Sequence, residues 1–399
     1  MSEFLFPAPS LSALPIRGKN ERIPIRRIFC VGRNYEAHAK EMGGVADREA
    51  PFYFTKASEH YVASGSTIDY PLGTSNCNYE MELVVALGAP AFRVSVERAL
   101  DAVYGYACGL DMTRRDLQNA AREQKRPWDL GKDYEQSAVI GEVVPAAEIG
   151  HPKSAAIELR LNGETKQNSD ISQLIHDVPH IIAHLSNYYH LNAGDVIFTG
   201  TPEGVGPVKP GDTLEGSVAG VGTISLHIAT RGASFASGLE AAAEGLLAEV
   251  GTLPAELVSW KPADDVWSVM EILGHVSEFI PYWTGQAVQI ARHQQEQWGR
   301  THADTDRMDA VNRARSGSLA DVTNEIRAGV GTAAATLRGL TDAELAAEAM
   351  SRNPRWGLKP ASFVVEQLVV QHAEKHLGQI RRNASQFRAR NDRHVTTGT

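Results

Sequence analysis

The strongest constraint on the fold is a change of hydrophobic pattern near residue 230. Up to that point short β-rich runs alternate with Gly/Pro turns, as in IFCVG, PFYFTK, YEMELVVALG and DVIFTGTP. Later in the chain, apolar residues recur at intervals of three and four, as in WSVMEILGHVSEFIPYW. The first pattern is typical of short strands joined by turns, and the second of amphipathic helices. The sequence therefore predicts two domains of different class, which suits a length of 399 residues.

The same patterns set the expected domain boundaries. We expect a β-rich domain over residues 1–230 and a linker at 231–237, within the small-residue stretch RGASFASG. An antiparallel four-helix bundle over residues 238–385 is the simplest way to bury the apolar stripes of the second half. Its helices are expected at about 238–250, 267–294, 318–340 and 361–384, followed by a polar, frayed tail at 386–399.

Composition excludes several classes of function. A formal charge of -9 gives no basic surface of the kind that nucleic acid requires. No stretch approaches the ~20 apolar residues of a membrane helix, and the N-terminus lacks the pattern of a secretory signal. The three cysteines form no CxxC pair and indicate neither a disulfide framework nor a thiolate zinc site. We therefore expect a cytoplasmic protein with no nucleic-acid or membrane partner.

Two acidic residues interrupt the apolar stretch NYEMELVVALG. Alternation along a strand puts Glu80 and Glu82 on one face and Met81, Leu83 and Val85 on the other. Two neighbouring carboxylates are costly when buried unless a proton or a cation lies between them. A solvated edge strand with its acidic face in water is the alternative, because many antiparallel sheets have one wet face.

Asp111 is a third carboxylate in a similar context, since it ends the apolar run VYGYACGLDMT. Three carboxylates that converge from two strands would form an oxygen-rich site suited to Mg²⁺ or Mn²⁺, with positions left for water or substrate. Periodicity alone leaves open whether they converge or are unrelated surface acids.

The order of several motifs in the first half is similar to that of a known family. The motifs are CVGRNYEAHAKEM, FYFTKAS, NYEMELVVALG, GYACGLDMTRRDLQ, RPWDLGKDYEQSA and DVIFTGTPEGVG, between about residues 27 and 229. By these motifs the first domain resembles the fumarylacetoacetate hydrolase family. The resemblance implies a mixed β-roll fold, a homodimer, and a divalent cation, Mg²⁺ or Mn²⁺, at the positions matching Glu80, Glu82 and Asp111.

The resemblance also implies a catalytic His and Glu on a lid helix, here His38 and Glu41, and an active-site lysine, here Lys132. The i, i+3 spacing places His38 and Glu41 on one helical face, where the carboxylate can orient the imidazole as it takes a proton from water. Without the neighbouring motif, an exposed surface pair is the simpler interpretation. A cation would polarise the 2-oxo acid part of a diketo acid, and Lys132 would stabilise the departing pyruvate enolate.

Four further residues are candidates for binding a small-molecule diketo acid. Arg33 and Arg115 can each hold a carboxylate bidentately, Gln118 lies in the same motif as Arg115, and Thr201 lies in the turn GTPEGVG. Within the family, DREAPFYFTKAS, GLDMTRRDLQ and RPWDLGKDYEQSA are most similar to hydrolases that act on fumarylpyruvate in gentisate breakdown. We expect hydrolysis of fumarylpyruvate to fumarate and pyruvate. Another acylpyruvate hydrolase or an oxaloacetate decarboxylase is the alternative.

Three histidines stand out in the second half. In QHAEKHLGQI, His372 and His376 have the i, i+4 spacing at which two imidazoles can bind one transition metal, and His275 lies on an earlier predicted helix. A solvated helix face is the alternative interpretation. KPADDVWSVMEILGHVSEF followed by HAEKHLGQI resembles the DinB-like bundle superfamily over about residues 237–384. That resemblance implies Zn²⁺ or another transition metal such as Ni²⁺ on His275, His372 and His376.

One branch of that superfamily consists of maleylpyruvate isomerases, which suggests a bifunctional enzyme whose second domain forms fumarylpyruvate. That branch uses a carboxylate among its metal ligands, whereas this chain offers His372 and His376, and Glu374 projects to another side of the helix. No cysteine lies beyond Cys108, so the reaction would need an external thiol such as glutathione or mycothiol. A non-catalytic dimerisation or docking module is the competing hypothesis.

Overall fold

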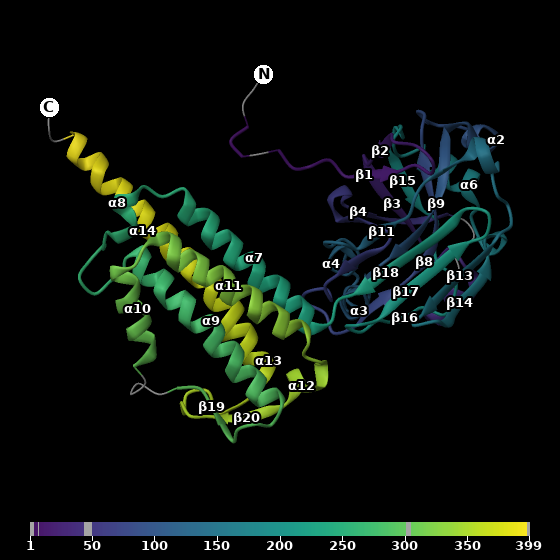
Figure 1. Cartoon of the computed structure of the whole chain (residues 1–399). Coiled ribbons are helices and arrows are strands. Elements are labelled where there is room, and N and C mark those ends of the chain that lie inside the picture. Colours follow the sequence, from purple (N-terminus) through teal and green to yellow (C-terminus); the bar gives the residue numbers. More distant parts are fainter. Residues whose placement is uncertain (1–3, 7, 44–49, 301–304, 397–399) are drawn as a thin grey trace. The chain divides into compact units, whose positions relative to one another are not determined.

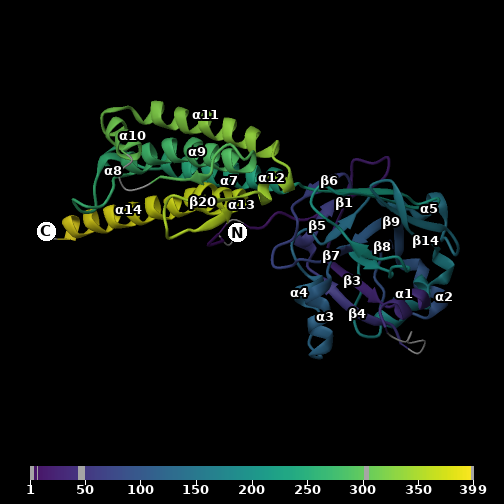
Figure 2. The same cartoon turned by 90° about the horizontal axis from the view of Figure 1, so that it is seen from below.

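The computed structural model describes residues 4–6, 8–43, 50–300 and 305–396. The chain divides into two compact units, Met1–Ala229 and Thr230–Thr399 (Figures 1 and 2). The first unit is β-rich and the second is mainly helical, which confirms the predicted fold classes. Within the described residues, no helix combines the length and apolar character that a membrane crossing requires.

The first unit is built around a mixed sheet that comprises eight strands among the described residues. Along its main path the strands follow the order β4 (Phe52–Lys56), β3 (Arg27–Gly32), β15 (Asp195–Phe198), β8 (Met81–Leu87), β9 (Val103–Asp111), β11 (Ala138–Ile140) and β5 (Tyr61–Ala63), and β12 (Val144–Pro145) pairs with β9.

Strand β8 lies inside this sheet between β15 and β9, and all seven of its residues are buried. Met81, Leu83 and Val85 belong to one apolar core, and Val84 belongs to a second core on the opposite face. The alternative of a solvated edge strand is therefore excluded. Glu80, which immediately precedes β8, and Glu82 within it lie on the same side as Val84.

A second sheet covers one side of this core, because Leu159, Leu214 and Leu226 pack in the same cluster as Met81. In the described chain it has the order β14 (Glu164–Asp170), β13 (Ala156–Leu161), β17 (Thr213–Val218), β18 (Gly222–Ile228) and β6 (Ser66–Ile68). Smaller sheets join β10 (Thr113–Arg114), β7 (Cys77–Tyr79) and β16 (Gly206–Pro207), and β1 (Ala13–Pro15) with β2 (Arg22–Pro24).

Short helices connect the strands of the first unit. Three of them carry candidate site residues, namely α1 (Glu36–Glu41), α3 (Arg115–Glu123) and α4 (Asp129–Lys132). The others are α2 (Val96–Ala99), α5 (Ala146–Ile149), α6 (Val178–Leu185) and single 3-10 turns at Ser58–His60, Leu100–Ala102 and Ile171–Gln173.

The second unit contains the helices that the apolar stripes predict. These are α7 (Arg231–Gly251), α9 (Val269–Ala291), α11 (Leu319–Arg338) and a long C-terminal segment made of α13 (Ala361–Val364), a π-helical turn (Val365–Val370) and α14 (Gln371–Thr396). Elements that sequence reasoning missed are α8 (Ala255–Ser259), α10 (Asp306–Ser316), α12 (Asp342–Ala346) and a small sheet of β19 (Gln297–Trp298), β20 (Glu348–Ser351) and β21 (Leu358–Pro360).

The expected linker at 231–237 is wrong, because these residues form the first turns of α7. The Thr230 hydroxyl accepts a hydrogen bond from the amide of Ala233 at 3.2 Å and caps the helix. The small residues permit close packing, since a Cβ at Gly232 would lie 2.3 Å from the Leu337 carbonyl oxygen. The expected frayed tail at 386–399 also differs, because α14 continues to Thr396, and residues 397–399 lie outside the described chain.

Two candidate metal centres

In the first unit, Glu80, Glu82 and Asp111 bring their carboxylates together. Each offers one oxygen, and these oxygens lie within 4.8 Å of one another. The antiparallel pairing of β8 and β9 sets this geometry, because it places Glu82 opposite Gly109, and the Asp111 amide donates to the Glu80 carbonyl at 2.9 Å. The three residues are 4%, 2% and 0% exposed, so they are buried acids rather than unrelated surface acids.

Cationic side chains compensate two of the three carboxylates. Lys132 Nζ lies 2.7 Å from Glu80 Oε2 and 2.6 Å from Asp111 Oδ2, and Lys56 Nζ lies 2.9 Å from Asp111 Oδ1. Arg115 forms a further ion pair with Glu80 Oε1. Burial alone would raise the pKa of Glu80, but the Lys132 and Arg115 charges outweigh it and lower that pKa.

Glu82 is the carboxylate with the least compensation. Its Oε2 accepts a hydrogen bond from the Gly200 amide at 2.6 Å. Burial, followed by repulsion from Asp111 and Glu80, raises the pKa of Glu82 well above its usual value. Asp111 Oδ1 is also buried, and its contact with Lys56 Nζ at 2.9 Å is an ion pair without a well-aligned hydrogen bond. A divalent cation among these hard oxygen donors would compensate the charge of Glu82, so the residues fit Mg²⁺ or Mn²⁺.

His38 and Glu41 form a second element of this site at the end of α1. His38 Nδ1 lies 3.2 Å from Glu41 Oε2, and Glu41 Oε1 accepts from the Gly204 amide at 3.1 Å. Although burial opposes it, these hydrogen bonds lower the pKa of Glu41, which favours a charged carboxylate beside the imidazole. The His38 side chain is only 8% exposed, which does not fit the exposed surface pair considered from sequence.

A small cavity of about 30 Å³ joins most of the candidate residues. The ones that line it are Arg33, His38, Glu80, Glu82, Arg115, Gln118, Lys132 and Thr201. Asp111 and Glu41 lie directly behind this lining, where they contact Lys132 and His38. Sequence reasoning missed Lys56, although a lysine at the end of the strand FYFTK that is fully buried requires a partner of opposite charge.

The four candidate substrate-binding residues differ in their surroundings. Arg115 is 6% exposed and its guanidinium binds Glu80 and Gln118, so it braces the acidic cluster in this structure. Thr201 accepts a hydrogen bond from Gln167 Nε2 at 2.8 Å. Arg33 has a left-handed backbone (φ 58°) and lies over the Trp128 ring, on the border of both the small cavity and a larger cleft.

That larger cleft, of about 690 Å³, adjoins the acidic cluster. It shares Arg33, Trp128 and Lys132 with the small cavity. Among the described residues its lining is strongly cationic, because Asp129 supplies the one carboxylate beside Arg33, Arg122, Lys125 and Arg126. Lys132 also lines the cleft but is paired with Glu80 and Asp111. Such a cleft attracts an anionic ligand longer than the small cavity holds.

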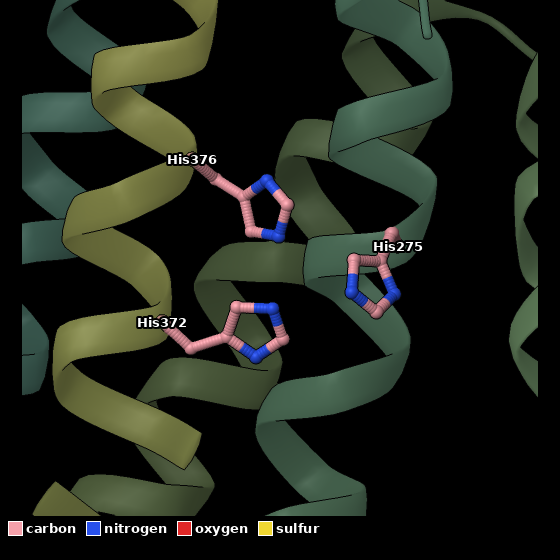
Figure 3. Close-up of side chains that lie close together, drawn as sticks. All are labelled: His275, His372 and His376. Carbon is pink, nitrogen blue, oxygen red and sulfur yellow. The ribbon is translucent and has the colours of Figure 1, made fainter. Parts of the chain in front are cut away.

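The second unit brings together His275 from α9 and His372 and His376 from α14. One nitrogen of each imidazole lies within 4.8 Å of the others, and Figure 3 shows one ring nitrogen of each turned toward the other two rings. His275 and His376 are 4% and 8% exposed, so the solvated-face interpretation is wrong for them. Glu374 is exposed, as its position on another side of the helix predicts.

The electrostatics of this cluster favour neutral imidazoles. Burial, and secondarily the neighbouring histidines, lower the pKa of His275 to about 2 and that of His372 to about 4. Burial also lowers the pKa of His376. His275 Nδ1, His372 Nδ1 and His376 Nε2 are buried without a hydrogen-bond partner among the described residues. Neutral imidazoles with available lone pairs fit a transition metal such as Zn²⁺.

The low pKa values predict acid sensitivity of the metal-free helical unit. Unfolding returns both histidines to a pKa near 6.5, so the unfolded chain binds more protons below that pH. The free energy of unfolding should therefore decrease as the pH is lowered from 6.5 to 4, by up to about 1.4 kcal/mol per pH unit for each histidine. Thermal unfolding followed by the helical circular dichroism signal measures this slope. The stability of a His372→Asn variant should depend less steeply on pH. An equal pH dependence in the two proteins would contradict the lowered pKa of His372.

Both units are similar to known protein families. The family model for the fumarylacetoacetate hydrolase C-terminal domain matches residues 27–229. A fumarylpyruvate hydrolase from Ralstonia sp. is 53% identical over 189 residues, which cover 47% of this chain and 98% of that protein. A mitochondrial oxaloacetate decarboxylase from Dictyostelium discoideum is 38% identical over 199 residues, 50% of this chain and 91% of that protein.

A solved structure also matches the first unit. The fumarylpyruvate hydrolase from Pseudomonas aeruginosa, in complex with Mn²⁺ and pyruvate, is 47% identical with a TM-score of 0.55, covering 57% of this chain and 99% of that chain. The second unit matches the DinB superfamily model over residues 238–380.

Proposed function

Because the chain belongs to the fumarylacetoacetate hydrolase family, we propose that its first unit hydrolyses the C–C bond of fumarylpyruvate and releases fumarate and pyruvate. The observation that carries this proposal is the buried cluster of Glu80, Glu82 and Asp111, since Glu80 and Glu82 share one cavity with His38 and Lys132 and Asp111 lies directly behind its lining. The similarity to fumarylpyruvate hydrolases, one of them bound to Mn²⁺ and pyruvate, supports both the substrate and a divalent cation in this unit.

Each side chain has a role that follows from its contacts. When bound, a divalent cation supplies a Lewis acid that polarises the carboxylate and 2-oxo group of the substrate. His38, oriented by Glu41, accepts a proton from water as that water attacks the distal carbonyl carbon. The C–C bond then breaks, and its electron pair passes to the pyruvate enolate, whose negative charge the Lys132 ammonium stabilises. Protonation of that enolate carbon completes the release of pyruvate.

An oxaloacetate decarboxylase is the second candidate, since such a relative is 38% identical to this chain. The cationic cleft favours the longer substrate. Fumarylpyruvate carries a second carboxylate far from its 2-oxo group. Arg33 and Arg122 line both the small cavity and the cleft, and Arg126 lines the cleft but not the small cavity. The two carboxylates of oxaloacetate are closer together, so the longer substrate makes better use of the cleft.

Arg126→Ala should weaken the recognition of the distal carboxylate. Arg122 already donates to the Met42 carbonyl at 2.9 Å, which makes Arg126 the better candidate. Loss of one charge-assisted hydrogen bond costs about 1.5–3 kcal/mol, which corresponds to a loss of about 10–100-fold in kcat/KM. We expect this loss chiefly as an increase in KM. Steady-state kinetics should show a much smaller loss for acetylpyruvate, which lacks that carboxylate. Lys209→Ala, at an exposed lysine outside the cleft, is the control, and equal losses for both substrates would contradict this role.

We further propose that the second unit isomerises maleylpyruvate to fumarylpyruvate with an external thiol. A thiolate would add to the cis double bond, allow rotation about the resulting single bond, and leave as the trans double bond forms. The chain's own cysteines are unsuited to this step. All three are buried in the first unit, where burial raises the pKa of Cys77 to about 11 and of Cys108 to about 12.

Supplying the two isomers separately tests both activities. The full-length protein should release fumarate and pyruvate from fumarylpyruvate without added thiol, and from maleylpyruvate only with glutathione or mycothiol present. A His275→Asn/His376→Asn variant should lose the second reaction and keep the first. Release of fumarate from maleylpyruvate after exhaustive removal of thiols would refute the thiol mechanism. No release from maleylpyruvate under any condition would favour a non-catalytic docking module instead.

A further inference from the structure

An ion pair lies beside the three-histidine cluster in the second unit. Glu278 follows His275 by three residues on α9, and both of its carboxylate oxygens accept hydrogen bonds from Arg300. Arg300 Nη1 lies 2.5 Å from Oε1, and Nη2 lies 3.1 Å from Oε2. Both side chains are only 12% exposed, and the guanidinium also lies over the rings of Tyr282 and Trp283. The carboxylate is therefore held in one orientation.

This orientation directs one carboxylate oxygen at His275. Glu278 Oε2 lies 3.8 Å from His275 Nδ1. That nitrogen is buried and has no hydrogen-bond partner among the described residues. A movement of less than about 1 Å would bring the two atoms to hydrogen-bond distance. The His275 nitrogen that is turned toward His372 and His376 in Figure 3 is therefore Nε2.

A similar arrangement is already formed at a second histidine of the cluster. His376 Nδ1 lies 3.1 Å from Gln379 Oε1, also three residues later on its helix. With the Gln379 amide oriented this way its oxygen accepts, which matches the His376 tautomer that carries its proton on Nδ1. The buried Nε2 has no hydrogen-bond partner among the described residues. His275 and His376 thus each have an acceptor one turn away on the side opposite the cluster.

We propose that Glu278, held by Arg300, is a positioning residue for the metal centre of the second unit. It accepts the Nδ1 proton of His275, fixes that tautomer, and presents the Nε2 lone pair to the site shared with His372 and His376. A cation on Nε2 makes the Nδ1 proton more positive and so strengthens its attraction to the carboxylate. The proposal rests on the metal centre proposed above, but its effect on the tautomer exists without metal.

Arg300 has a definite part in this arrangement. A largely buried carboxylate loses solvation energy unless a cationic partner compensates it. The bidentate Arg300 guanidinium is that partner, and it limits the rotation of the Glu278 carboxylate. Glu278 Oε2 lies on the Nδ1 side of the His275 ring, away from the nitrogen turned toward the other two histidines, so this position suits a hydrogen-bond acceptor for His275 rather than a fourth metal ligand.

The test uses the full chain with ¹⁵N-labelled histidine and a double variant, Glu278→Leu/Arg300→Met. Replacing both members leaves no unpaired buried charge, so the fold should be retained. Long-range ¹H–¹⁵N spectra of the metal-free protein report the His275 tautomer, with the signal assigned from a His275→Asn variant. We expect Nδ1–H in the natural chain and a loss of that preference in the double variant. Zn²⁺ affinity, measured by calorimetry, should fall about 10–100-fold.

Glu240→Gln is the matched control, because it breaks the exposed Glu240–Arg338 ion pair of the same unit, whose side chains are 41% and 46% exposed. It should change neither the tautomer nor the Zn²⁺ affinity. An unchanged His275 tautomer in the double variant would overturn the proposal, as would unchanged Zn²⁺ affinity. If the natural chain bound no Zn²⁺, the proposed metal centre would fail, and the metal-free spectra would still decide the role of Glu278.

Discussion

Replacing His38 by alanine is expected to lower kcat for fumarylpyruvate hydrolysis by about 10²–10⁴-fold, the usual contribution of a positioned general base. The imidazole is buried, hydrogen-bonded to Glu41, and lines the same cavity as Glu80 and Glu82, so it is placed to take a proton from water there. Mn²⁺ affinity should stay unchanged, because His38 is not one of the clustered carboxylates. Steady-state kinetics and calorimetric Mn²⁺ titration check the two parts.

Lys40→Ala provides the matched control on the same short helix. Lys40 is 70% exposed and pairs with Glu36 on the surface, so its loss should alter kcat less than about twofold. A His38→Ala variant that kept kcat within threefold of the natural chain would remove the catalytic assignment. A variant that lost Mn²⁺ together with activity would instead make His38 part of the metal site.

Replacing Glu82 by glutamine should produce two effects of opposite sign. Changing a residue that only supports a metal ligand lowers metal affinity by about 10–100-fold. Glu82 is proposed as a direct ligand, so its replacement should lower Mn²⁺ affinity by at least about 100-fold. The metal-free protein should nevertheless become more stable. The raised pKa of Glu82 means that its ionised form is disfavoured in the folded chain, and a neutral amide relieves repulsion from Asp111 and Glu80. Calorimetry and thermal unfolding near pH 7 measure the two effects.

Glu215→Gln is the comparison variant, since Glu215 is an exposed glutamate on β17. It should change neither property. If Glu82→Gln lowered the melting temperature of the metal-free protein, Glu82 would be a structural partner rather than an uncompensated ligand. If Mn²⁺ affinity were retained, the cation would bind elsewhere.

The sequence predicted the acidic cluster only in part. Alternation along β8 places Glu80 and Glu82 on one face, but the position of Asp111 depends on the register of β8 against β9, which periodicity does not contain. The cations were harder to foresee. Lys56 and Arg115 reach the cluster from β4 and α3, so their partners are defined only by tertiary packing. For this reason the sequence predicted only a substrate-binding role for Arg115 and not its ion pair with Glu80.

In the second unit, apolar spacing predicted the four main helices, and the i, i+4 pair of His372 and His376 predicted one side of the histidine cluster. Small residues misled the interpretation at 231–237, because the same composition permits a flexible linker and a closely packed helix such as the turn around Gly232. The π-helical turn that precedes His372 has no local sequence signal, although such turns are frequent at functional sites.

Anomalous X-ray diffraction at the manganese edge, from crystals of the full chain grown with Mn²⁺ and pyruvate, tests the central claim most directly. The expected result is one strong peak in the first unit, at about 2–2.3 Å from an oxygen of Glu80, of Glu82 and of Asp111, with pyruvate beside Lys132. A first unit in which Glu80 and Asp111 stayed paired with Lys132, Lys56 and Arg115 and Glu82 with the Gly200 amide, with manganese absent or bound at other residues, would contradict it.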